Sequence, residues 1–199
     1  MGSSRRAGRP SARERLLAAA DELFYAEGVQ SVGIDRVIEH AGVAKASLYN
    51  TFGGKEQLIR AYLEARHARA SEHVRHVMEC CRTPRERILA IFEAQGEVFA
   101  SPDFHGCAFV SAAAEARPGG LVEQAADDHR RALRAVFTEL AEQAGAADPA
   151  RLAHQLHLLY DGAVLSARHD RCPTAAEAAR AAAAALLDAA AGPAREGPG

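Results

Sequence analysis

The sequence has little of what β-sheets, membranes and secretion require. The alternation of Val, Ile, Thr and Tyr that is typical of strands is almost absent, whereas alanine, the strongest helix former, is abundant. No apolar run has the length and bulk of a transmembrane helix or of a signal-peptide core, and charged residues interrupt the alanine-rich stretch 175–191. These absences predict an all-α protein that is soluble, cytoplasmic and without a membrane partner.

Cysteine frameworks and catalytic motifs are also missing. The four cysteines have no spacing typical of disulfide scaffolds, so we expect free thiols in a reducing compartment. There is no glycine-rich phosphate loop, no GxSxG and no HExxH. His73, His76 and Cys80 share a helical face and could hold a soft metal, but nine histidines make such spacings common by chance. We therefore predict no enzyme, no metal site and no cofactor.

The charge that is present is unevenly distributed. Residues 1–55 carry a net charge of +2, whereas the remainder of this chain of net charge −2 carries −4. Most of the early positive charge lies ahead of Leu16, and a short basic arm before a helix suits a phosphate backbone. A solubilising tail is the alternative interpretation. The arm residues predicted to contact DNA are Arg5, Arg6 and Arg9.

Apolar periodicity and capping signals predict nine helices. Ser11 with Glu14 and Thr83 with Glu86 form capping boxes, and Gly28 is a good C-terminal stop. The expected helices cover about 11–28, 33–40, 45–52, 55–81, 84–100, 107–116, 121–144, 149–167 and 174–191.

Two of these helices, 33–40 and 45–52, are short and joined by a tight turn with a central glycine, Ala41-Gly42-Val43. This arrangement, braced by the preceding helix, predicts a helix-turn-helix whose second helix enters the major groove. Leu48 and Phe52 would face inward. The side chains left on the outer face suit phosphates, adenine edges and thymine methyls, and are Lys45, Ala46, Ser47, Tyr49, Asn50 and Thr51.

Residues 32–63, VGIDRVIEHAGVAKASLYNTFGGKEQLIRAYL, resemble the DNA-binding domain of the TetR family of transcriptional regulators. The resemblance covers about residues 11–65. It departs at Thr51, where the family often has histidine, and at Gly53-Gly54, which leaves Gly54 to begin the next helix without a side-chain cap. The positions that carry it are Gly28, Ala41-Gly42-Val43, Tyr49, Phe52 and Lys55.

The resemblance implies roles for individual residues. Tyr49 and Lys55 would contact phosphates, while Lys45, Ser47 and Asn50 would lie on the groove-facing side. Each residue also has a purely structural interpretation. Asn50 could be a solvated helix residue, Tyr49 could be part of the core, and Lys55 could be an ordinary surface lysine. A cation at a helix N-terminus opposes the helix dipole, which favours a functional role for Lys55.

The resemblance also implies a domain organisation and a function. Residues 1–10 would be a flexible basic arm, 11–55 the helix-turn-helix domain with its reading pair at about 32–52, 56–191 a ligand-binding and dimerisation domain, and 192–199 a disordered tail. The expected protein is a repressor that binds a palindromic double-stranded operator as a homodimer. A small, largely apolar effector would release it. The alternatives are an activator or DNA-organising protein without a ligand and, more remotely, a helical-bundle enzyme.

Candidate residues in the second domain are aromatic or polar positions in apolar stretches, and small residues on the last helices. Cys107 has three interpretations: a redox sensor at a helix N-terminus, a packed apolar residue, or pocket lining. The ligand candidates are Phe92, Gln95, Phe99, Cys107, Phe109, His129, His157 and Tyr160. The dimer candidates, which could instead pack only within their own domain, are Leu165, Ala178, Ala182, Ala185 and Leu186.

Overall fold

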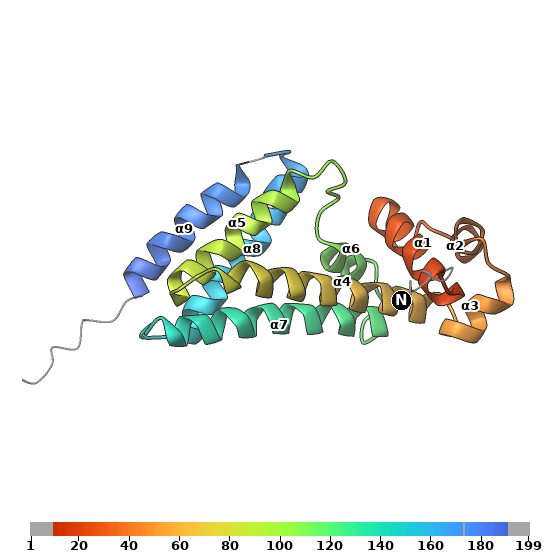
Figure 1. Cartoon of the computed structure of the whole chain (residues 1–199), viewed down its shortest axis with the longest axis horizontal. Helices are drawn as coiled ribbons and strands as arrows, with labels where there is room; N and C mark the ends of the chain where they lie inside the picture. Colours follow the sequence, from red (N-terminus) through yellow and green to blue (C-terminus); the bar gives the residue numbers. More distant parts are fainter. Residues whose placement is uncertain (1–9, 173, 191–199) are drawn as a thin grey trace, which may run out of the picture.

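The computed structural model describes residues 10–172 and 174–190, which contain nine α-helices and no β-strand (Figure 1). The predicted all-α class is confirmed. The predicted arm residues Arg5, Arg6 and Arg9 and the predicted tail 192–199 lie outside the described residues. The helices are α1 Ala12–Glu27, α2 Ile34–Ala41, α3 Lys45–Phe52, α4 Lys55–Glu79, α5 Pro84–Phe99, α6 Ala108–Ala114, α7 Leu121–Gln143, α8 Pro149–His169 and α9 Ala175–Ala190.

The molecule is elongated, with α1–α3 at one end and α9 at the other (Figure 1). The long helices α4 and α7 pack side by side along the long axis. Helices α5, α8 and α9 pack together at the far end, and α6 lies on α7 between the two groups. This layout puts α6 where it can contact the N-terminal helices.

The predicted capping boxes at Ser11 and Thr83 are present. The Ser11 hydroxyl accepts the Glu14 backbone N–H at 3.2 Å, while the Glu14 carboxylate accepts the Ser11 backbone N–H at 2.7 Å. The hydrogen bonds that the Ser11 backbone N–H and hydroxyl donate to the Glu14 carboxylate lower its pKa below the ordinary value. Thr83 and Glu86 repeat the arrangement ahead of Pro84. The sequence therefore specifies the starts of α1 and α5 locally.

Two observed helices end two residues earlier than predicted. Helix α4 ends at Glu79 instead of residue 81, because the Cys81 N–H bonds the Met78 carbonyl in a tightened last turn. Helix α6 ends at Ala114 instead of residue 116, and the Glu115 carbonyl accepts the Gln30 side-chain amide at 3.2 Å outside the helix. A long-range contact thus takes over where α6 stops.

The buried side chains form two clusters. One lies among α1–α3 and continues into the first half of α4, into α6 and into the start of α7, with Leu58, Tyr62, Phe109 and Val122 among its members. The other joins α5, the second half of α7, α8 and α9. The predicted domain division at residue 55 remains a prediction. The core of the helix-turn-helix nevertheless extends well past that residue.

Candidate functional site

The turn between α2 and α3 is held by glycine and by an arginine from α1. Gly42 has φ +60, the left-handed conformation that its place at the end of α2 requires. The Arg15 guanidinium donates to the Gly42 carbonyl at 2.9 Å and to the Ala41 carbonyl at 3.4 Å. These bonds satisfy carbonyls that the end of α2 would otherwise leave without partners.

Exposed ion pairs add to the contact between α1 and α2. Arg36 of α2 forms two contacts with Glu27 of α1, the longer at 2.8 Å. His40 Nε2 lies 2.7 Å from Glu22 Oε2. Exposed pairs of this kind stabilise little individually, at most about 1 kcal/mol, so their main effect is to set the orientation of α2.

Helix α3 has one buried face and one open face. Leu48 is completely buried and Phe52 is half-buried, as the sequence predicts. Tyr49 is 47% exposed, which contradicts the alternative that it is part of the core. The other candidates on the open face are exposed Lys45, Asn50 and Thr51 and half-buried Ser47.

Two of these open-face side chains already have intramolecular partners. Lys45 Nζ pairs with Asp35 Oδ1 at 2.8 Å, and this hydrogen bond raises the pKa of the Lys45 ammonium. The Thr51 hydroxyl donates to the Ser47 carbonyl at 2.6 Å. Within the described part of the chain, the side-chain polar groups of Ser47, Tyr49 and Asn50 form no intramolecular hydrogen bond, and of these three residues Tyr49 and Asn50 are exposed. They are the groups of α3 best placed to meet an external partner.

Lys55 lies at the start of α4 and faces the loop after α1. Gly54 precedes it without a side-chain cap, as predicted. Lys55 Nζ donates to the Gln30 carbonyl at 3.3 Å, and burial lowers its pKa against the opposing effect of Glu115. If Lys55 contacts a phosphate, its ammonium group would therefore bind both the phosphate and the Gln30 carbonyl of this loop.

Several ligand candidates pack into the core around α5 and α8. Phe92 stacks on Phe137 with ring centroids 6.0 Å apart and meets Tyr160 edge-on at 6.2 Å. Gln95 is 4% exposed; its amide N–H donates to the Tyr160 carbonyl at 2.9 Å, while its Oε1 has no partner. Phe99 packs on the edge of this core, and its ring centroid lies 4.9 Å from that of Phe104.

The histidine candidates form a second group, in which His157 is buried and His129 is half-buried. His129 stacks on Phe109 with centroids 3.6 Å apart, and its Nδ1 lies 3.1 Å from Nδ1 of His67. Burial, together with the neighbouring His67, lowers the pKa of His129 to about 4. His157 is buried beside Asp161, and burial lowers its pKa as well. Both rings are therefore neutral near pH 7.

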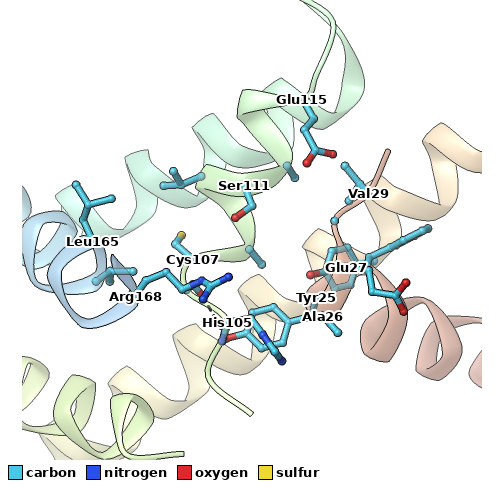
Figure 2. A pocket seen from close by; sticks show the side chains of 18 of the residues that line it. Tyr25, Ala26, Glu27, Val29, His105, Cys107, Ser111, Glu115, Leu165 and Arg168 are labelled. Carbon is cyan, nitrogen blue, oxygen red and sulfur yellow. Dashed lines mark hydrogen bonds between the residues drawn. The ribbon is translucent and has the colours of Figure 1, made fainter. Parts of the chain in front are cut away.

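A cavity of about 360 Å³ lies at the junction of α1, α6 and α8 (Figure 2). Of the predicted ligand residues only Cys107 lines it, together with Leu165, which the sequence analysis places in a dimer interface. The other lining residues have no shared sequence signal, because they come from four segments far apart in the chain. They include Tyr25, His105, Ser111, Glu115, Asp161 and Arg168.

Two hydrogen-bonded contacts border this cavity and join α1 to the segment around α6. The Tyr25 hydroxyl donates to the Gly106 carbonyl and accepts the His105 N–H, both at 3.1 Å. The Glu115 carboxylate accepts the Gln30 N–H at 2.9 Å. The cavity therefore touches both the helix-turn-helix region and the C-terminal helices.

The Cys107 thiol has neither the exposure nor the pKa of a reactive group. The residue is half-buried, and burial raises the pKa of the thiol against the opposing effect of backbone hydrogen bonds from Val110 and Phe109. All four cysteines are free thiols. Of the three interpretations of Cys107, this position directly supports lining of the cavity.

The outer faces of α8 and α9 carry exposed apolar side chains. Leu158 and Leu165 of α8 are 57% and 58% exposed. On α9, the predicted interface residues Ala178 and Ala185 are exposed, whereas Ala182 and Leu186 are half-buried. Two small-residue faces of this kind allow close approach of another helix.

Residues 10–172 and 174–190 contain neither a metal-binding cluster nor a membrane-spanning helix. No group of three or more His, Cys, Asp or Glu side chains there could hold a metal ion. None of those helices is both long and apolar enough to span a bilayer.

The N-terminal region matches a known family. Residues 16–62 fit the sequence model described as "Bacterial regulatory proteins, tetR family". The HTH-type transcriptional regulator LmrA of Bacillus subtilis is 35% identical over 82 residues, which are 41% of this chain and 44% of LmrA. The HTH-type transcriptional activator FasR of Mycolicibacterium smegmatis is 34% identical over 96 residues, 47% of this chain and 44% of FasR. The match spans less than half the length of either relative.

The similarity to solved structures extends over nearly the whole chain. SCO4454, a TetR-family transcriptional regulator from Streptomyces coelicolor, superimposes with a TM-score of 0.85 at 33% identity. The superposition covers 91% of this chain and 96% of SCO4454. Both the helix-turn-helix and the C-terminal helical domain are therefore shared.

Proposed function

Since this chain belongs to the TetR family and is a DNA-binding transcriptional regulator, not an enzyme, we propose that it is a repressor released by a small molecule. The open face of α3 carries this proposal: Tyr49 and Asn50 project from a helix that Leu48 anchors in the core. Tyr49 with Lys55 would contact phosphates and Asn50 a base edge. Lys45, Ser47 and Thr51 would complete the surface, with Arg5, Arg6 and Arg9 ahead of it.

The proposed form on DNA is a homodimer on a palindromic site in the cytoplasm. Each chain offers one reading helix, and a two-fold operator needs two. The exposed apolar faces of α8 and α9 support an interface there, with Leu165, Ala178, Ala182, Ala185 and Leu186 as its proposed members.

We place the proposed effector site among helices α4 to α8. The ring cluster around Gln95 is filled by its own side chains, whereas the junction at Cys107 is hollow, so the hollow supports ligand binding more directly. A ligand releases DNA only if it binds the DNA-incompetent arrangement better, typically by about 1–3 kcal/mol. The remaining proposed residues do not line this hollow and would support its walls. They are Phe92, Phe99, Phe109, His129, His157 and Tyr160.

A gel shift with the promoter fragment of its own gene, combined with light scattering, tests this proposal. We expect a dimer at micromolar concentration that retards the promoter fragment. A promoter–reporter fusion then gives the sign: lower expression with the protein supports repression, whereas higher expression supports the role in FasR's description, that of an activator. A monomer that fails to shift the fragment would refute the proposal.

A further inference from the structure

Within the described residues, Arg168 is the one arginine or lysine among the side chains that line the cavity between α1, α6 and α8. The three carboxylates that line the cavity each contact a partner from outside its lining, whereas Arg168 forms no ion pair within the described residues. Figure 2 shows Arg168 extending from α8 toward His105 and Cys107. The partners of the carboxylates are Arg36 for Glu27, Arg130 for Asp161 at 3.4 Å, and the backbone N–H of Gln30 for Glu115 at 2.9 Å.

The backbone of the loop before α6 positions this arginine. Gly106 has φ +97, and a Cβ added there would lie 3.3 Å from Cγ of Arg168. The aliphatic stem of Arg168 therefore rests on Gly106, whose carbonyl is held by the Tyr25 hydroxyl. This packing leaves the guanidinium beside the hollow.

The remaining walls of the cavity are mostly apolar or small. Val110 and Leu165 are 47% and 58% exposed, far more than large aliphatic side chains within a closed core. The volume of about 360 Å³ is within the range of small-molecule sites. A guanidinium beside apolar surface suits a ligand with one carboxylate and an apolar body, because the fork of N–H groups matches both carboxylate oxygens.

We propose that this cavity binds a small organic carboxylate, with the carboxylate on Arg168 and the apolar body against Val110 and Leu165. The inference rests on the proposed function, since it gives the chemical class of the effector. The cavity wall includes Tyr25 and Gly28 at the end of α1, so an occupant directly contacts the helix that supports the turn before α3. Occupancy changes how α1 sits against α6, and the affinity for operator falls.

The test compares acids with uncharged and cationic analogues on the full-length protein. Octanoate, phenylacetate and benzoate are each assayed against the corresponding primary amide, and octanoate also against octylamine, by melting temperature and by promoter binding. We expect at least one acid to raise the melting temperature and to weaken promoter binding by about 5- to 150-fold, while its amide does neither.

Three variants locate the effect. Arg168→Gln abolishes the response to the acid, and Arg168→Glu transfers the preference to octylamine, a change that a merely structural role would not produce. Arg131→Gln, at an exposed arginine of α7 paired with Asp128, serves as the matched control and responds like the wild type.

Two results would overturn the inference: none of the acids raises the melting temperature of the wild type, or Arg168→Gln responds to them as the wild type does. Promoter binding by the ligand-free protein is read separately. Its absence would refute the proposed function, whereas promoter binding that no carboxylate weakens through Arg168 would refute the effector class alone.

Discussion

The N-terminal helices α1–α3 and the C-terminal helices α5–α9 are stabilised in different ways. In the first region specific polar contacts set each turn, as Arg15 does on the Gly42 carbonyl and Glu22 on His40. In the second region most buried side chains are small, aliphatic or aromatic, directional contacts such as that of Gln95 with the Tyr160 carbonyl are few in the core, and α9 buries four alanines. In the first region the positions of the helices depend on individual polar side chains. In the second region many substitutions of similar volume would preserve the helix packing.

This difference also separates the two candidate sites. The open face of α3 depends on residues within one short helix and its turn, so a local motif specifies it. The junction cavity depends on how α1, α6 and α8 meet, through contacts such as Tyr25 with Gly106. One site is therefore robust to sequence change elsewhere, and the other is where relatives can differ.

Leu48→Ala should have the largest effect on the N-terminal region. Leu48 is completely buried, so its truncation leaves a cavity and should lower the free energy of unfolding by about 2–5 kcal/mol. Tyr49→Ala, next to it but exposed, should change that free energy by about 0.5 kcal/mol or less. Urea unfolding of both variants checks this contrast. Equal losses would mean that the two faces of α3 are assigned the wrong way round.

The pH dependence of stability tests whether His129 is a specific polar group within the largely apolar packing of the C-terminal region. Its pKa is about 4 in the folded protein against about 6.5 in an unfolded chain, so between these values the unfolded chain binds the extra proton. Stability is therefore complete above about pH 6.5 and should fall by about 2 kcal/mol between pH 6.5 and 5 from this group alone.

His129→Gln should remove that part of the pH dependence. Urea unfolding at several pH values gives the slope for the wild type and the variant. His157, whose pKa burial also lowers, should leave a residual slope in both proteins. Identical slopes would show that His129 is protonated equally in the folded and unfolded chains.

Tyr49→Ala and Lys55→Ala should weaken DNA binding about tenfold each, because each would remove one of the proposed phosphate contacts. Phosphate contacts carry no sequence information, so the loss should be similar on promoter and unrelated DNA. Arg75→Ala, at an exposed arginine near the far end of α4, is the control and should bind as the wild type does. Fluorescence anisotropy measures all three, and a loss confined to promoter DNA would instead assign base reading to the residue.

Cys107→Ser should have the smallest effect, because burial raises the pKa of the thiol and leaves little thiolate near pH 7. Peroxide or an electrophile should leave promoter binding by the wild type unchanged. If the wild type lost binding and Cys107→Ser kept it, the thiol would be the sensor.

The fold was largely predictable from sequence because its signals are local. Capping boxes at Ser11 and Thr83, the turn glycine Gly42 and the apolar periodicity each act within a few residues. The starts of α3, α4 and α7 agree with the predicted residues, whereas the end of α6 does not, because Gln30 engages Glu115 from a distant segment.

The two sites differed in how far the sequence could predict them. The buried and exposed faces of α3 follow from helical periodicity, and Leu48 and Tyr49 lie as that periodicity predicts. The cavity does not follow from any periodicity. Arg168 and Tyr25 are polar residues near helix ends, and only the packing of α8 and α1 against the loop before α6 brings them together.

The salt dependence of promoter binding tests the central claim most directly, that the open face of α3 is the DNA-binding surface of a dimer. Binding to a promoter fragment and to unrelated DNA is measured by anisotropy at about 50 and 200 mM salt, with the number of chains per DNA from light scattering. With about six to ten phosphates contacted, affinity should fall by about 10³-fold or more across that range, and two chains should bind each operator. Affinity that is independent of salt, or equal for promoter and unrelated DNA, would contradict it.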